Sequence, residues 1–77
     1  MATSSITVGT LAYVSLGTGP MLISPENSIA IVGDASQPAA TAAGHPIIET
    51  ALPFYFPLAE EVWAIALSSS TSVIVTT

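Results

Sequence analysis

Turn-forming residues divide this chain of 77 residues into short segments, and its longest uninterrupted apolar run, Val62 to Leu67, is six residues long. Residues 17–20 (Gly-Thr-Gly-Pro) predict a tight hairpin turn, because glycine reaches positive φ angles and proline presets its own φ. Segments such as Ile29 to Val32 and Val73 to Val75 are rich in β-branched side chains, which suit a pleated sheet. The spacing predicts a single all-β domain over residues 1–77, a small β-sandwich or jelly-roll-like barrel of about six to eight short strands.

Two segments give more detail about the expected strands. Residues 11–16 alternate between more and less apolar side chains, which predicts a half-buried strand. Val62 to Leu67 is more apolar than alternation requires, and such continuous runs are typical of strands buried on both faces. Trp63, with its apolar neighbours, is therefore expected in the core.

The segment from Asp34 to Pro46 is the least regular part of the chain, and we expect an irregular arm or loop at about residues 34–46. Pro38 and Gly44 bracket an alanine-rich stretch, in line with the preference for proline at a helix start and glycine past its end. One short turn of helix and an extended docking arm both fit this pattern. Long irregular segments are often functional, so Pro38, Ala39 and Ala40 are candidate interface residues.

The charge inventory is one-sided, with no Lys or Arg and a net charge of −5. Binding to nucleic acid requires cationic side chains that displace counterions from phosphates, and attraction to anionic membranes requires them too. We therefore expect neither nucleic acid nor an anionic membrane to be a partner of this protein. Without internal cations, some acids are expected to pair with Arg or Lys of a partner chain, Glu60 and Glu61 among them.

The small size of the chain predicts assembly. A domain of this length buries only about 60% of the surface that its unfolded form exposes, and small folds add disulfides, a metal or a partner chain. The sequence has no Cys and is 51% hydrophobic, so a homo-oligomer is the expected source of added stability. It has neither a 20-residue apolar stretch for a membrane helix nor a secretory signal pattern, so we expect a soluble protein made in a cytoplasm.

No motif in the sequence carries catalysis or binds a cofactor. His45 and Asp34 are residue types of a hydrolase triad that also needs a serine. The Gly-x-Ser-x-Gly elbow that would present such a serine is missing from the sequence. We expect His45 to be a turn residue whose ring bonds a backbone carbonyl. Residues 17–19 lack the lysine of a phosphate loop, and the acids match no EF-hand spacing. We therefore expect that the protein is not an enzyme, has no catalytic residue and binds no metal or cofactor.

Three consecutive aromatic residues, Phe54, Tyr55 and Phe56, predict an exposed contact. The flanking Pro53 and Pro57 place this strand at a sheet edge, because proline cannot donate to the ladder. Successive side chains on a strand point to opposite faces. We expect Tyr55 to point outward between buried Phe54 and Phe56, and aromatic side chains of this kind are common interface anchors.

Residues 29–77 contain a series of short motifs in a characteristic order. In order they are Val32-Gly33, Gln37-Pro38-Ala39-Ala40, Gly44-His45-Pro46-Ile47, Leu52-Pro53, Val62-Trp63-Ala64-Ile65-Ala66 and Val73-Ile74-Val75. The series resembles small structural proteins of tailed phages, in which a hydrophobic strand, a Pro-Ala segment, a Gly-His or Gly-Pro turn, a Val-Trp-Ala strand and a short closing strand recur. The resemblance implies a β-sandwich that decorates or stabilises a virion shell, or that sits in a tail or fibre attachment.

We therefore expect a structural virion protein, made in the host cytoplasm, that decorates or stabilises a phage capsid. Its partners would be the major capsid protein and neighbouring copies, in a trimer or other symmetric oligomer. Two alternatives stay open: a tail or fibre accessory protein, and a small carbohydrate- or ligand-binding β module that uses Trp63, Tyr55 and His45. The candidate interface residues are Phe54, Tyr55, Phe56, Pro38, Ala39, Ala40, His45, Glu60 and Glu61.

Overall fold

The computed structural model describes residues 2–47 and 54–77, and this part of the chain forms β-strands and no helix. The Leu52-Pro53 motif, which includes the proline before the aromatic segment, lies outside the described ranges. In chain order the strands are β1 (Thr3–Val8), β2 (Val14–Thr18), β3 (Met21–Pro25), β4 (Ile29–Gly33), β5 (His45–Ile47), β6 (Phe54–Phe56), β7 (Glu61–Ala66) and β8 (Thr71–Thr76).

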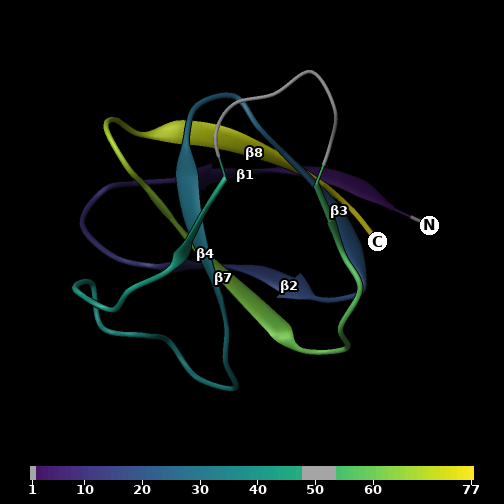
Figure 1. The fold of residues 1–77 in the computed structure, drawn as a ribbon. Helices are drawn as coiled ribbons and strands as arrows, with labels where there is room; N and C mark the ends of the chain where they lie inside the picture. Colours follow the sequence, from purple (N-terminus) through teal and green to yellow (C-terminus); the bar gives the residue numbers. More distant parts are fainter. Residues whose placement is uncertain (1, 48–53) are drawn as a thin grey trace.

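The strands pair into two antiparallel sheets that pack face to face (Figure 1). One sheet, sheet A, has the order β1-β8-β3-β6, and the other, sheet B, has the order β2-β7-β4-β5. The pairs β1–β8, β2–β7, β3–β6 and β4–β5 are those of one long hairpin that has been rolled up, so that successive pairs fall in alternate sheets. This double-sheet arrangement is the jelly roll. The expected all-β sandwich is confirmed.

Alternation along the strands builds the core between the sheets. In β3, Met21 and Ile23 point inward and are fully buried, whereas the intervening Leu22 is exposed. In β8, Val73 and Val75 are buried and Ile74 is exposed. This period of two is the strand signature. The inner side chains of both sheets form one cluster, which consists of Val8, Leu16, Met21, Ile23, Ile29, Ile31, Ile47, Val62, Ala64, Ala66, Val73 and Val75.

The central strand β7 is buried on both faces, as its apolar sequence predicts. The prediction is wrong at Leu67, which lies beyond β7 and is 49% exposed. Val62, Ala64 and Ala66 belong to the core between the sheets. Ile65 points to the opposite side, where it packs with buried Tyr13 in a second cluster. The outer side of sheet B is therefore a second, smaller core.

The turn expected at residues 17–20 is not a hairpin. β2 pairs with β7 in sheet B, whereas β3 pairs with β8 and β6 in sheet A, so this segment crosses between sheets. Gly17 has a φ of 109°, a left-handed conformation that glycine tolerates best. The register of β2 against β7 shifts between Ser15 and Gly17, which is a β-bulge. β2 also begins at Val14, later than the alternation of residues 11–16 indicates.

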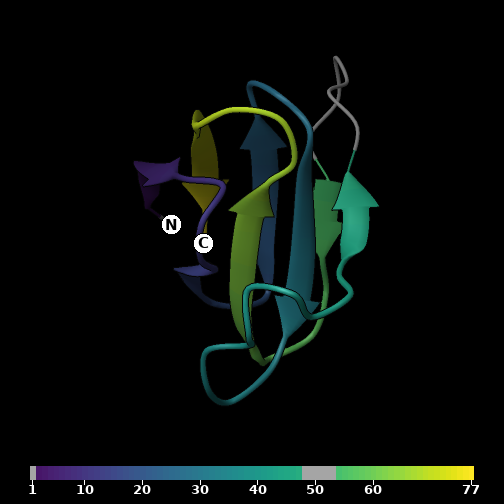
Figure 2. The ribbon, with the colours of Figure 1, turned by 90° about the vertical axis from the view of Figure 1, so that its left-hand side faces the viewer.

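The 34–46 segment is neither a helix turn nor an extended arm. Ala42 donates its backbone N–H to the carbonyl of Ala39 at 2.9 Å, which closes a single turn within the β4–β5 connection. His45 and Pro46 already belong to β5 and pair with β4. Figure 2 shows this connection crossing in front of sheet B. The irregular segment is therefore a folded loop of residues 34–44.

Candidate interaction surface

The aromatic strand β6 forms an edge of sheet A, as its prolines predict. Tyr55 points outward and is 56% exposed, which confirms its expected orientation. Phe54 was expected to be buried, and this is wrong: it is 39% exposed, because an edge strand has no neighbour to cover its rim. Phe56 is half-buried and packs against the core cluster. Its ring lies close to Gly19 and Gly33, where a Cβ would meet it at 2.9 Å and 3.4 Å.

No other described residue covers the outer side of sheet A, and its outward positions include no charged residue. Tyr55 lies opposite Leu22 on β3, and Ile74 projects from β8; Leu22 and Ile74 are each 37% exposed. The remaining outward positions are hydroxyl side chains, and Thr3 and Thr76 hydrogen-bond across the β1–β8 pair at 2.9 Å. We call this surface the open face; it consists of Thr3, Ser5, Thr7, Leu22, Ser24, Tyr55, Ser72, Ile74 and Thr76.

Leu22 and Ile74 are part of this surface and were not singled out from the sequence. A signal for Ile74 exists in the alternation of β8, where Ser72, Ile74 and Thr76 share the face opposite to buried Val73 and Val75. A single apolar residue among hydroxyl residues indicates an outward face with one exposed hydrophobic side chain.

The outer side of sheet B is covered instead. Tyr13 is 2% exposed and lies over Ala30 and Ile65. Its hydroxyl donates to the carbonyl of Ala42 at 2.9 Å, and the Gln37 side-chain amide donates to the Tyr13 carbonyl at 2.8 Å. We call this surface the covered face; its outward positions Ala30, Val32, Trp63 and Ile65 pack with Tyr13 and with Ala42 of the 34–44 loop.

The candidate loop residues divide between packing and exposure. Pro38 is half-buried, whereas Ala39 and Ala40 are exposed at the turn. Gly44 allows the loop to approach sheet B, because a Cβ there would lie 2.8 Å from the Tyr13 hydroxyl and 3.0 Å from the Ala30 Cβ. Such contacts are too short for an alanine without movement of its neighbours. The loop therefore packs on the fold through Pro38, Ala42 and Gly44, and its other residues are exposed.

Trp63 lies at the rim of the covered face and is only half-buried, so the expected core position is wrong in part. Its indole N–H donates to the carbonyl of Asp34 at 3.1 Å. A partly exposed ring with a satisfied polar end fits the amphipathic character of tryptophan. The bond fixes the start of the 34–44 loop on sheet B.

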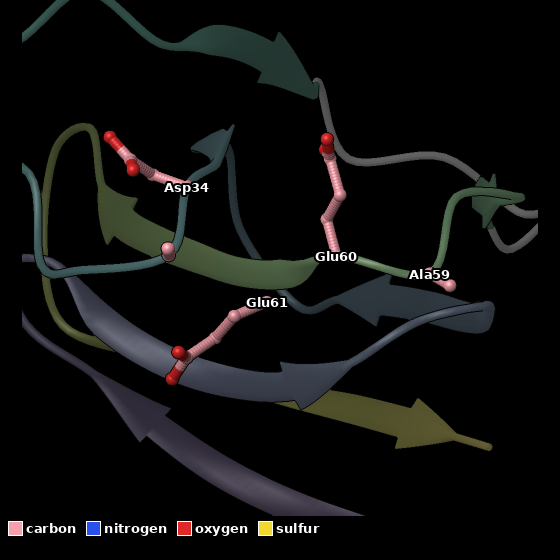
Figure 3. A pocket seen from close by; sticks show the side chains of 5 residues that line it. Asp34, Ala59, Glu60 and Glu61 are labelled. Carbon is pink, nitrogen blue, oxygen red and sulfur yellow. The ribbon is translucent and has the colours of Figure 1, made fainter.

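Acidic side chains gather at the end of the sandwich that holds the β4–β5 and β6–β7 connections. Asp34, Glu60 and Glu61 line a hollow of about 400 Å³ together with Ala35 and Ala59. Glu60 and Glu61 point in opposite directions (Figure 3), as expected for neighbours at the start of a strand. The three carboxylates give this end a negative potential.

The two glutamates differ in their surroundings. The Glu61 carboxylate accepts a hydrogen bond from the Ser15 hydroxyl at 2.8 Å, across the β2–β7 pair. Glu60 is exposed, and its carboxylate lies beside Gly33, where a Cβ would come within 2.7 Å of an oxygen. Glu60 is therefore the more available of the two for a partner.

His45 is not a turn residue, because it begins edge strand β5 and is exposed. β5 and β6 lie at the same side of the sandwich, one in each sheet (Figure 2). The structure thus places His45 on the side of the molecule that carries the aromatic strand. Within the described residues, no group of three His, Cys, Asp or Glu side chains lies close enough to hold a metal ion.

Trp63, Tyr55 and His45 do not form one carbohydrate-binding site. Trp63 lies on the covered face of sheet B, and Tyr55 lies on the open face of sheet A. These faces are on opposite sides of the sandwich. The set proposed for the ligand-binding alternative is therefore separated.

Comparison with known proteins gives this chain no relative: no family model, curated protein or solved structure matches it. In the residues that the structure describes, no helix is present that is long and apolar enough to cross a membrane.

Proposed function

We propose that this protein is a non-enzymatic structural protein of a virion, which decorates or stabilises a phage capsid by binding the major capsid protein and neighbouring copies. The observation that supports the proposal is the open face, a sheet surface that carries Leu22, Ile74 and Tyr55 and no charged side chain. Exposed apolar groups that are gathered on one surface mark sites of interaction. A partner protein that covers this face would remove its three exposed apolar side chains from water.

The side chains on this face suit protein docking. Tyr55 offers a large, rigid ring with a polar end, and such residues are over-represented at the centre of interfaces. Leu22 lies directly opposite it on the neighbouring strand, so the two form one apolar contact. Phe54 extends the contact around the sheet edge.

The acidic end would steer the approach to a cationic partner. Asp34, Glu60 and Glu61 lie at one end of the molecule, and the chain holds no Lys or Arg to neutralise them. Complementary charge raises the association rate and fixes orientation, whereas exposed ion pairs contribute only about 0–1 kcal/mol each. The open face would therefore supply most of the affinity, and the acidic residues would raise the association rate.

The jelly roll supports this class of function without selecting it. Double-sheet jelly rolls occur in viral capsid proteins and in lectins, and a fold by itself does not define a function. A tail or fibre accessory protein would use the same surface. Quantifying the protein in purified particles separates these roles, because a shell lattice requires a high copy number and a tail a low one. Absence from particles would contradict the proposal.

Binding to capsid shells that have been stripped of this protein tests the surface itself. We expect Tyr55→Ala and Leu22→Ser to shorten retention on the shells strongly, and Glu60→Gln to slow association with little effect on retention. Raising the salt concentration should likewise slow association, because screening acts over about 10 Å at 0.1 M. If both open-face variants remain bound as long as the wild type, the assignment of this face is wrong.

A further inference from the structure

We propose that β1 is a self-complementary docking edge, through which two copies of this chain pair antiparallel about Ser5 and join their two A sheets into one continuous sheet. The proposal goes beyond the capsid role and needs no capsid protein. It rests on the backbone and the sequence of β1.

The four edge strands of the sandwich differ in how they resist pairing. Edges are protected by shortness, proline, charged side chains or bulges. β5 is three residues long and contains Pro46, and β6 is three residues long and is followed by Pro57. β2 carries the bulge between Ser15 and Gly17.

β1 has none of these protections. It is six residues long, with the sequence TSSITV, and contains neither proline nor a charged residue. Its register against β8 is regular from Thr3 to Val8. Figure 2 shows β1 at the left margin of the molecule, with no strand beyond it. A long, regular and uncharged edge is a template for another strand.

The unpaired backbone groups of β1 follow from its ladder with β8. Ala2 and Thr77 exchange both backbone hydrogen bonds, each at 2.9 Å. In an antiparallel pair, hydrogen-bonded and non-hydrogen-bonded residue pairs alternate. Ser4, Ile6 and Val8 therefore bond to β8. Thr3, Ser5 and Thr7 direct their N–H and C=O groups to the open edge.

This edge is complementary to itself. With Ser5 opposite Ser5 of the second copy, Thr3 lies opposite Thr7 and Thr7 opposite Thr3. Each such pair exchanges two hydrogen bonds, so the joint would contain about six. The side chains of these residues all lie on the open face and are exposed. Thr–Thr neighbours across strands are favourable, and a two-fold joint of this kind closes on itself.

Charge does not oppose pairing through β1, whereas it opposes approaches that bring the acidic ends of two copies together. Two copies with a net charge of −5 each repel one another, and the repulsion is strongest where carboxylates meet. β1 contains no carboxylate. We therefore expect raised salt to tighten the dimer by screening the remaining repulsion, the opposite of its effect on association with a cationic shell.

Light scattering on the isolated protein tests the dimer. The wild type should show twice the monomer mass at micromolar to millimolar concentrations. Ser5→Lys places two like charges opposite each other at the two-fold axis and should weaken the dimer by at least about tenfold. Thr18→Lys adds the same charge at the exposed end of β2 and should leave the dimer intact. A wild-type monomer throughout, or equal effects of both lysines, overturns the proposal.

Engineered cysteines test the register, and the chain has no Cys of its own. Under oxidised glutathione, Ser5→Cys should form a covalent dimer, because facing residues in such a pair have Cα atoms about 5.5 Å apart, within disulfide range. Ser4→Cys is the matched control: Ser4 is also exposed, but its Cα is offset from that of its counterpart beyond the roughly 7 Å limit. Cross-linking of Ser4→Cys that equals or exceeds that of Ser5→Cys overturns the pairing about Ser5.

These outcomes are independent of the capsid assay. Ser5 lies on the open face beside Ile74, so the shell binding of Ser5→Lys does not separate the two proposals. A wild type that stays monomeric in solution but binds shells would contradict β1 pairing alone. A dimer that forms normally while the protein binds no shell would leave β1 pairing intact and contradict the capsid role.

Discussion

The covered face and the open face are the outer surfaces of two sheets of equal strand number, and they differ in what lies on them. On the covered face the outward residues are apolar and pack with Tyr13 and the 34–44 loop. On the open face they are mostly Ser and Thr, with Leu22, Ile74 and Tyr55 left exposed. The difference shows that one sheet completes its own packing, whereas the other keeps a surface free. Substitutions at matched positions can measure that difference.

The largest expected effect concerns the two tyrosines. Tyr13→Ala should destabilise the fold by about 3–5 kcal/mol, the range for removal of a buried aromatic side chain, because Tyr13 is 2% exposed and bonds to Ala42. Tyr55→Ala should cost about 0.5 kcal/mol or less, as exposed substitutions do. Urea denaturation gives both values. Similar losses for the two variants would mean that the open face is also part of the core.

A smaller effect is expected where the 34–44 loop meets sheet B. Gly44→Ala should cost about 1–3 kcal/mol through overpacking, because the new Cβ would lie 2.8 Å from the Tyr13 hydroxyl and 3.1 Å from the Ile31 carbonyl. Gly9→Ala is the control, since its Cβ would meet only the Ser70 hydroxyl, at 3.9 Å. Thermal unfolding followed by circular dichroism compares them. A neutral Gly44→Ala would show that the loop moves freely from the sheet.

The smallest effect on stability is expected on the open face. Ile74→Thr replaces an exposed side chain of β8 by another β-branched one, so we expect a loss of about 0.5 kcal/mol. Its retention on stripped shells should nevertheless fall, because the apolar contact is reduced. A loss of stability comparable to that of Gly44→Ala would show that Ile74 packs within the fold, and would remove the distinction between the faces.

Local sequence patterns predicted those features of the strands that depend only on neighbouring residues in the sequence. The prolines around residues 54–56 identified an edge strand, and the continuous apolar run at 62–67 identified β7 as buried on both sides. Tyr55 was oriented correctly because alternation needs only its neighbours. The exposure of Phe54 was not predicted, because it depends on which parts of the chain lie beside the edge of the sheet. A local sequence pattern does not contain this information.

Other features depend on contacts between distant parts of the chain. The sequence of residues 17–20 does not indicate that β2 and β3 belong to different sheets, because a tight turn and a crossing between sheets use the same residue types. The role of Tyr13 as the cover of sheet B depends on the 34–44 loop, whose Gln37 and Ala42 bond to it. The alanine-rich stretch indicated a helix turn by composition, but contact with sheet B determined its shape.

The rolled hairpin has a consequence for how the chain is made. β1 pairs with β8, and β8 also joins β1 to β3. During synthesis, sheet A therefore consists of unconnected pieces until β8 has left the ribosome. Folding of this domain must follow the synthesis of β8, and it must close the long loop between β1 and β8, which slows it. In that interval the apolar strands of each nascent chain are exposed. The carboxylates that give the chain its charge of −5 would then keep unfinished copies apart and soluble, a role separate from any partner.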